Sequence, residues 1–516
     1  MKRFTPRVTG LSRLIALAFM AIGLWQTPAF GGAVVWDGGT GVWFGPWLGN
    51  LPGNPIPTPA PITNWLCEFC NPGAGDTANI GTLFGSPIGP VTGTAILNSP
   101  TTVAGVALGN GANGGLQVSS GGNLTTGKLT IGTIPPGSGT LTITSGGVVN
   151  TGPATLGLQA GTAGTVTVMG SGSELNTGAN TLSVGFSGQG TLTIQNGGVV
   201  NNNSVAFIGA NPGSVGTVTV TGAGSQLISN GLHGLYVGVD GQGTLTIQNG
   251  GMVEDSQTLI ASGNGANGAA AIGAVTVTGA GSELNSAGGV FVGYDGGQGT
   301  LTIQNGGAVS DGYGIVGGIS GSPGSVLLDA GTWINTEWLD IAPGGGIGTV
   351  TVQDGGQLTA GEMSIESGGT LNVDPSTVDV NGDFTLSSGG LLLLAIAGTG
   401  PGSYSQLDIT GTGTFDGIIE FEFIDGFAPQ AGDTFDLINA TGGANLSGAT
   451  FHIEGLAPGF EYSEAFASGE LTLTALNDGI ATPEPSSAWL FGGGLNALLL
   501  VVAVKKALAG RRLRES

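Results

Sequence analysis

The chain has 516 residues, of which 105 are glycine, and only 8% are charged. Glycine follows no strict three-residue period, which excludes collagen, and a mean hydropathy of +0.30 is too apolar for a disordered chain. Residues 32–482 hold 31 acidic residues and a single basic one, Lys128, so this body has a net charge of −30 that excludes nucleic-acid binding.

The first 31 residues have the features of a secretory signal peptide. Basic residues precede an apolar run from Leu14 to Trp25, and small residues follow at Ala29 and Gly31. Because this apolar run is short for a membrane span, we expect residues 1–31 to be cleaved, which predicts an exported protein that begins near Gly32.

Residues 32–110 differ in composition from the rest of the body. They contain Trp36, Trp43, Trp47 and Trp65 and a proline-rich run between positions 52 and 61. We interpret this segment as an N-terminal cap on the repeats that follow, since the open end of a repeat array invites aggregation unless it is covered.

This segment also contains the only two cysteines, Cys67 and Cys70. An exported protein meets an oxidising environment, so we predict a local disulfide between them. Free thiols and a metal site are the alternatives. Zinc would need two further ligands, and the two histidines, His233 and His452, lie far along the chain.

Residues 111–390 consist of repeats about 25 residues long. The peptide Gly190–Val200 recurs almost intact at Gly243–Val253 and at Gly299–Val309. With a second, looser type of copy included, the repeats begin at Gly139, Gly164, Gly190, Gly216, Gly243, Gly273, Gly299, Gly324 and Gly348. A further copy begins near Gly115, and a degenerate one follows Glu362.

Each repeat predicts three short strands joined by tight turns. Apolar and polar residues alternate from Thr191 to Gln195, and Asn and Gly then mark a turn. A unit of this size cannot bury its own apolar face, so neighbouring units must stack. A propeller or a sandwich of antiparallel hairpins is the alternative, because regular strand spacing alone does not exclude it.

We therefore predict an all-β fold, a right-handed parallel β-helix in which each repeat forms one coil. About ten coils spaced by ~4.8 Å would give a rod roughly 50 Å long. Leucine and valine at two matching positions should point inside, and threonine and asparagine should point out; the inward residues are Val166, Leu192, Val218, Leu245, Val275 and Leu301.

Two further segments follow the repeats. Residues 391–480 contain predicted strands with more phenylalanine and more acidic residues, and we interpret them as a C-terminal β cap. Residues 481–516 contain Pro483, Glu484 and Pro485, an uncharged stretch at 488–504, and a basic cluster that begins at Lys505. The uncharged stretch predicts one transmembrane helix in the inner membrane, with the basic tail on the cytoplasmic side.

The tail resembles the PEP-CTERM protein-sorting signal of Gram-negative bacteria, on the basis of Pro483, Glu484 and Pro485, the span and the basic cluster. The repeats between about 115 and 360 resemble the type V secretion and PEP-CTERM-associated repeats of autotransporter-like passengers. The resemblance implies processing by an exosortase-like membrane enzyme, delivery to the cell surface, and an association with exopolysaccharide. A plain C-terminal anchor is the alternative.

Few residues are candidates for chemistry, and we predict no catalytic residues and no cofactor. Asp240 and Asp295 occupy equivalent Asp-Gly turns and are weak candidates for Ca²⁺. Glu254 with Asp255 is the best local pair of acids for a hydrolase, and Glu420 with Glu422 shares one strand face. Surface acid pairs are usually only solvated, and we expect neither pair to have a histidine or arginine from a neighbouring coil beside it.

The sequence thus predicts an exported, non-enzymatic scaffold of the cell surface or extracellular matrix. A glycan-binding adhesin is the alternative, and a polysaccharide hydrolase is a weaker one. For either alternative, Trp333 and Trp338 are the best platforms on which a sugar could stack, since they stand in otherwise polar repeats.

Overall fold

The computed structural model describes residues 33–35, 39–43, 77–82 and 93–482, except 233, 264–270, 320 and 468, and describes side chains from residue 94 onward. The predicted signal peptide at 1–31 lies outside the described residues. So do Cys67 and Cys70, the motif Pro483 to Pro485, and the predicted helix at 488–504.

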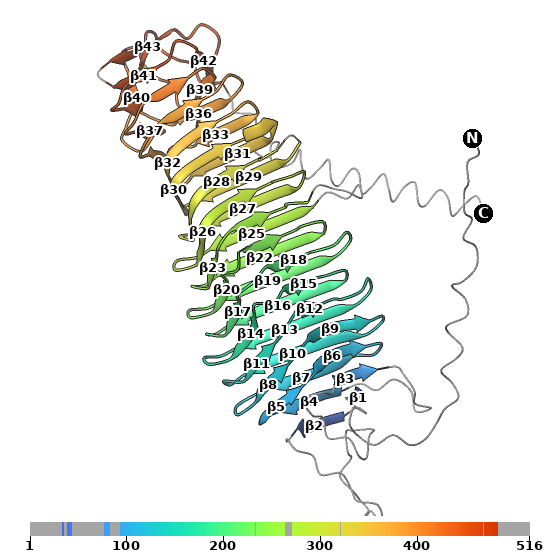
Figure 1. The fold of residues 1–516 in the computed structure, drawn as a ribbon. Coiled ribbons are helices and arrows are strands. Elements are labelled where there is room, and N and C mark those ends of the chain that lie inside the picture. The colour runs from blue at the N-terminus through green and yellow to red at the C-terminus, as the bar shows by residue number, and fades with distance from the viewer. Residues whose placement is uncertain are drawn as a thin grey trace, which may run out of the picture.

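The described chain winds into a rod of stacked coils (Figure 1). The first strand of each coil belongs to a 16-stranded sheet in which every neighbouring pair is parallel. Its strands are β2 (Gly39–Trp43), β4 (Gly93–Leu97), β7 (Gly114–Val118), β10 (Ser138–Thr144), β13 (Ala163–Met169), β16 (Gln189–Gln195), β19 (Val215–Thr221), β22 (Gln242–Gln248), β25 (Ile272–Thr278), β27 (Gln298–Gln304), β29 (Pro323–Asp329), β31 (Ile347–Gln353), β33 (Gly369–Val373), β36 (Leu391–Ile396), β39 (Ile418–Phe423) and β42 (Thr450–Glu454).

The second and third strands of each coil form two rows of a 28-stranded sheet, separated by a bend. The second strands are β5 (Pro100–Val103), β8 (Asn123–Thr126), β11 (Val148–Thr151), β14 (Glu174–Gly178), β17 (Val199–Asn202), β20 (Gln226–Ser229), β23 (Met252–Asp255), β34 (Thr377–Val380), β37 (Gln406–Ile409) and β40 (Thr434–Ala440). The third strands are β1 (Ala33–Val35), β3 (Thr77–Thr82), β6 (Gly105–Asn110), β9 (Leu129–Ile134), β12 (Ala154–Leu156), β15 (Leu182–Val184), β18 (Ala206–Ile208), β21 (Leu235–Val237), β24 (Thr258–Ile260), β35 (Phe384–Leu386), β38 (Gly413–Phe415) and β41 (Ala444–Asn445).

In four consecutive coils the second and third strands join into one long strand that runs through the bend. These strands are β26 (Glu283–Val292), β28 (Ala308–Val316), β30 (Thr332–Ile341) and β32 (Gln357–Ile365). The register between β26, β28 and β30 shifts at the bend, which marks these coils as irregular.

The coils follow the repeats of the sequence. The repeat glycines from Gly139 to Gly348 are direct partners in successive strands of the 16-stranded sheet. Each stands where two backbones approach closely, and a Cβ at Gly190 would collide with the backbone nitrogen of Gly185. The predicted frame of the repeats is therefore confirmed.

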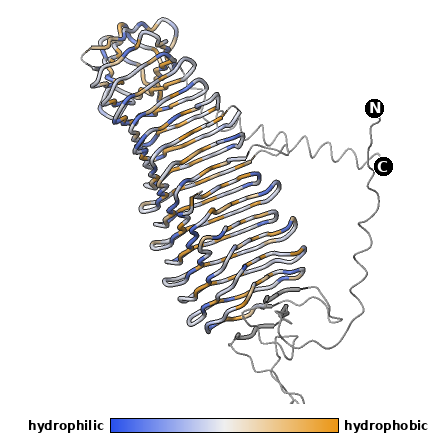
Figure 2. The backbone as a smooth tube through the Cα atoms, in the orientation of Figure 1, coloured by the Kyte–Doolittle hydropathy of each residue, from blue (hydrophilic) through white to orange (hydrophobic). Residues whose placement is uncertain are grey.

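The hydrophobic core fills the inside of the rod. The inward residues predicted from the repeats, such as Leu192, Leu245 and Val275, are at most 1% exposed. Hydrophobic and hydrophilic residues alternate along the coils (Figure 2). Parallel pairing of successive coils confirms the all-β parallel solenoid and excludes the propeller or sandwich of hairpins. In the described part of the chain, the only helical element is a single 3-10 turn, η1 (Pro343–Gly345).

Parallel coils extend beyond the predicted repeat region on both sides. The strands β4, β5 and β6 belong to the segment that we expected to be an N-terminal cap, and they pair in parallel with β7, β8 and β9 of the repeat region. At the other end, β36, β39 and β42 continue the 16-stranded sheet past residue 390. The glycine column of the repeats continues through Gly93 and Gly39 on the N-terminal side, but the rest of the repeat peptide is not conserved there, so comparison of the repeats with one another does not reveal these coils.

The rod closes with an antiparallel pair, β43 (Tyr462–Ala467) and β44 (Glu470–Ala475). The strand β44 also pairs antiparallel with β40, and its Leu471 and Leu473 are buried against the core. Among the residues described, no helix is both long and apolar enough to cross a membrane.

The dependence of the coils on a shared core leads to a stability prediction. Leu245→Ala removes a fully buried side chain from the interior and should lower the free energy of unfolding by about 2–5 kcal/mol. The neighbouring Thr246→Ala, on the outer face, should cost less than about 1 kcal/mol. Chemical denaturation of both variants measures the difference, and equal costs would contradict the inward orientation of Leu245.

Candidate functional site

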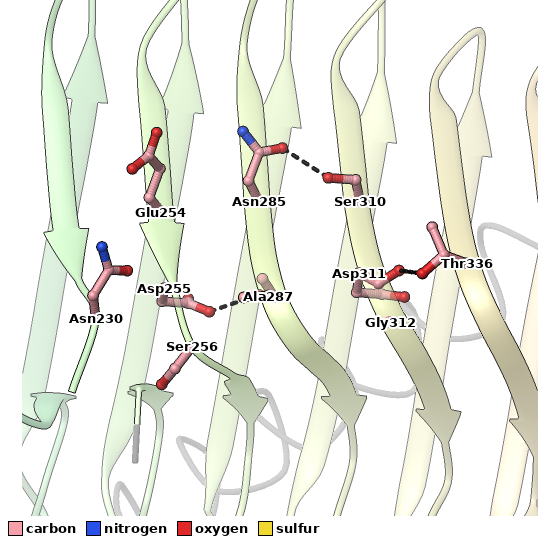
Figure 3. Close-up of a pocket in the computed structure, with 11 residues that line it drawn as sticks. Asn230, Glu254, Asp255, Ser256, Asn285, Ala287, Ser310, Asp311, Gly312 and Thr336 are labelled. Atoms are coloured by element: carbon pink, nitrogen blue, oxygen red, sulfur yellow. Dashed lines mark hydrogen bonds between the residues drawn. The ribbon is translucent and has the colours of Figure 1, made fainter. Parts of the chain in front are cut away.

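A groove of about 580 Å³ crosses several neighbouring coils at the bend of the 28-stranded sheet. Its floor passes over β23, β26, β28 and β30, in the region where the strands become continuous through the bend. The lining side chains are small and polar, with no basic group among them (Figure 3): Asn230, Glu254, Asp255, Ser256, Asn285, Ser286, Ala287, Ser310, Asp311, Gly312 and Thr336.

Glu254 and Asp255, which are adjacent in the sequence, lie on opposite faces of the strand β23. Successive residues of a strand point to opposite sides of the sheet. Glu254 is half-buried on the outer side, whereas Asp255 points into the rod and is 2% exposed. A substrate in the groove therefore cannot meet both carboxylates as a facing pair.

A column of buried polar residues runs along the inside of the bend. Its members are direct register partners from one coil to the next and are at most 4% exposed: Asn202, Ser229, Asp255, Ser286, Asp311 and Asn335. Sequence reasoning missed this column. The sequence feature that could have revealed the column is a polar residue about 12 positions after each repeat glycine, where the strand pattern places an inward side chain.

Asp255 forms a closed ring of contacts with two hydroxyls. Thr258 Oγ1 and Ser286 Oγ each donate to the Asp255 carboxylate, and the two hydroxyl oxygens also lie 2.8 Å apart. Three oxygen–oxygen contacts need three protons, and the two hydroxyls supply only two. The ring is complete only when the carboxyl of Asp255 carries the third proton and donates it to one hydroxyl, which can then donate its own proton to the other hydroxyl.

The electrostatics of Asp255 agree with this proton count. Burial raises the pKa of Asp255 from 3.8 to about 7, although hydrogen bonds from Thr258, Ser286 and the backbone of Gln257 oppose the shift. Desolvation disfavours the charged form of a carboxylate inside an apolar core. The acid is therefore held largely protonated below neutral pH.

Asp311 stands two coils further along the column and has different partners. Trp333 Nε1 donates to its Oδ2 at 2.8 Å, and Asn335 Nδ2 donates to its Oδ1. Burial raises the pKa of Asp311 to about 7, and the charge of Asp255 adds to the rise. Asn335 Oδ1 is buried without a hydrogen-bond partner, so this network is only partly satisfied.

The two tryptophans proposed as stacking platforms have different environments. Trp333 is 0% exposed and lies against Gly314, where a Cβ would stand 3.0 Å from its ring. No face of Trp333 is open to solvent, so a sugar cannot stack on it, and its indole serves the buried network instead. Trp338 is half-buried on the outer surface and stacks on Tyr313, with ring centroids 4.8 Å apart.

The weak Ca²⁺ candidates do not come together. Asp240 and Asp295 follow β21 and β26, and the coil of β24 lies between those strands. Within the described ranges, no group of three or more His, Cys, Asp or Glu side chains is arranged to hold a metal ion.

The second acid pair, Glu420 and Glu422, lies near the C-terminal end of the rod on β39. The structure places His452 of β42 directly beside Glu420 in register, and Glu454 beside Glu422. The expectation that no histidine from a neighbouring coil lies beside this pair is therefore wrong for Glu420. The coil step there is longer than in the repeats, so the sequence pattern did not place His452 in the next coil. His452 is exposed, and these groups do not line the groove at the bend.

The buried acids lead to a pH prediction. Asp255 and Asp311 bind protons more tightly in the folded than in the unfolded state, so their contribution to the unfolding free energy is largest below about pH 4, falls as the pH rises to about 7, and is then flat. Asp255→Asn supplies the missing donor without a charge. It should be more stable than the wild type at pH 8 and should have a weaker dependence on pH.

Denaturation midpoints at pH 5 and pH 8 measure this effect. Asp255→Ala is the control, because it leaves Thr258 and Ser286 facing a cavity and should be destabilising at both pH values. An unchanged pH slope in Asp255→Asn would show that Asp255 is ionised in the folded protein.

Comparison with known proteins gives little further information. No family model matches the chain, and no curated protein matches it. Among solved structures, the chain is similar to the crystal structure of a TibC-catalysed hyper-glycosylated TibA fragment, with 19% identity and a TM-score of 0.32 over 70% of this chain and 100% of that one. A likeness of this size carries no inference about function.

Proposed function

We propose that the protein is an exported, non-enzymatic scaffold of the cell surface or extracellular matrix. The observation that supports this most strongly is the uninterrupted stacking of coils from β4 to β42, which makes a long rod with a continuous core. A rod of this kind spans distance and presents repeated surfaces.

The proposal includes the route by which the protein leaves the cell. Residues 1–31 direct export, Pro483 to Pro485 with the helix at 488–504 form a PEP-CTERM sorting signal, and an exosortase-like enzyme of the inner membrane processes the tail. The basic cluster after residue 504 supports this orientation, since lysine and arginine remain on the cytoplasmic side. The rod is right-handed in this proposal.

The charge of the body supports an extracellular role among polymers. A net charge of −30 over residues 32–482 keeps neighbouring rods apart and soluble. We propose that the mature protein lies at the cell surface, in the outer membrane or the matrix, in association with exopolysaccharide.

The positions of the acids support a non-enzymatic role. Hydrolysis of a glycoside usually needs two carboxylates that flank the bond. Asp255 and Asp311 face the interior and are engaged with Ser286, Thr258 and Trp333. Glu254 alone is left on the outer side of the groove, which does not make a catalytic pair.

Fractionation with mass spectrometry of the C-terminus tests the sorting proposal. The wild-type chain should lose the residues after the Pro483–Pro485 region and leave the inner-membrane fraction, because processing removes the span. A variant with Glu484→Ala and Pro485→Ala should keep its full tail and remain in that fraction. A wild-type chain that retains its intact tail would contradict sorting and leave a plain anchored protein.

A further inference from the structure

We propose that the outer face formed by the third strands of seven consecutive coils, together with the polar groove beside it, binds an uncharged polysaccharide that lies along the rod. The proposal goes beyond the scaffold role and does not depend on it. It would stand if the sorting signal proved to be a simple anchor.

The first observation is the clustering of outward aromatic side chains. Between residues 94 and 390 the aromatic residues that are not fully buried all lie on this face, on or beside the third strands: Phe186, Phe207, Tyr236, Phe291, Tyr294, Tyr313 and Trp338. The only others in this range, Trp333 and Phe384, are 0% exposed. Outward aromatic residues spread at random over three faces of the rod would not gather in this way.

The second observation is the sharp limit of the apolar character on this face. One outward column is apolar over five consecutive coils, and its register partners are Phe207, Tyr236, Leu259, Phe291 and Ile315. The partner before Phe207 is Ser183, and the partner after Ile315 is Asp340. Leu259 is buried at 8% exposure, and the other four members are half-buried on the outer side. An apolar row that stays partly open to solvent on the outside of a rod is a candidate binding surface.

The aromatic row borders the groove. Tyr313 directly follows Gly312, and Trp338 follows Thr336 by two residues, while Gly312 and Thr336 both line the groove. Phe291, Tyr313 and Trp338 are linked by ring contacts of 5.6 and 4.8 Å. Trp338 is the last ring of this stack, since the next coil places Glu362 at its register position, so one face of its indole is not covered by another ring.

The groove itself offers groups that suit sugar hydroxyls. Asn230 is exposed and Glu254 half-buried on the outer side, and neither has a hydrogen-bond partner among the described side chains. Around them, Ser310 Oγ donates to Asn285 Oδ1 at 2.8 Å and Thr336 Oγ1 donates to the Asp311 carbonyl at 3.1 Å. These contacts fix the wall of the groove before any ligand arrives, which lowers the entropic cost of binding.

Charge selects the class of ligand. The only basic residue of the body, Lys128, lies between β8 and β9, several coils away from the groove. Anionic polysaccharides and a second copy of this chain would meet a body with a net charge of −30 and be repelled. An uncharged sugar chain combines apolar C–H faces, which suit aromatic rings, with hydroxyls, which suit amide and carboxylate groups.

The competing explanation is that the aromatic row only stabilises the rod through contacts between neighbouring strands. Phe207 and Tyr236, with ring centroids 5.3 Å apart, would serve such a role equally well. The two explanations predict different affinities for sugars, because a row of aromatic residues that only stabilises the rod would not bind a polysaccharide in solution.

Affinity electrophoresis of the full-length chain in mild detergent tests the proposal. Native gels containing dextran, laminarin or soluble hydroxyethyl cellulose provide uncharged chains, and gels containing alginate or chitosan provide charged ones. At least one uncharged polysaccharide should retard the wild-type chain, and added salt should leave the retardation unchanged. Alginate should not retard the wild-type chain.

Variants on the face should weaken the retardation. Trp338→Ala should reduce the affinity at least tenfold, and Trp338→Phe should recover part of it, since a ring remains. Tyr462→Ala changes a half-buried aromatic residue in the closing strand pair and should leave the affinity unchanged. Glu254→Gln and Asn230→Ala remove groove contacts without touching the core, so they test the site even if Trp338→Ala folds poorly by circular dichroism.

Three results would overturn the proposal. The first is that no uncharged polysaccharide retards the wild-type chain. The second is that chitosan alone does so and salt abolishes the effect, which would indicate attraction to the general negative charge. The third is that the Trp338, Glu254 and Asn230 variants all bind as tightly as the wild type.

Discussion

The constraint on which the whole molecule depends is that no coil can complete its own core or its own backbone hydrogen bonds. Every strand of the 16-stranded sheet except the two at its ends takes its partners from the coils before and after it, and residues such as Leu192 and Leu245 are buried only because a neighbour covers them. Stability is then largely a sum of contacts between nearest neighbours. Each coil is free to vary on its outer side as long as its inner side and its close backbone approaches are kept.

This freedom has a limit at the bend, where polar side chains point inward. A buried carboxyl is costly unless it is neutral or fully paired. Asp255 meets the condition by forming a ring with Thr258 and Ser286 that needs its proton, whereas Asp311 depends on Trp333 and on an Asn335 whose own oxygen is left without a partner. Of the three acidic residues that line the groove, Asp255 and Asp311 therefore point into the rod behind it, and only Glu254 lies on its outer side.

Much of the fold could be predicted from the sequence, because the repeat period, the alternation within each strand and the glycine positions all describe a coil. The register of Gly190 with Gly216 and the burial of Val218 follow directly from these features. The strands after residue 390 were predicted but were interpreted as a cap, so the parallel stacking of β36 on β39 as further coils was not foreseen. The site was predicted poorly. Adjacent acids such as Glu254 and Asp255 appear paired in a sequence but point to opposite sides of a strand, and Trp333 appears to be a surface residue until the space above Gly314 is known.

The closing strand pair also determines how rods can meet. A parallel solenoid without a closure would present its final strand as a template for any extended peptide. Here the strand β44 occupies one side of β40 in the opposite direction, and the outermost strand β43 carries the exposed acid Glu464. On this sheet the rod therefore ends in a strand pair that runs against the direction of the coils, which makes it a poor template for the parallel coil of another molecule.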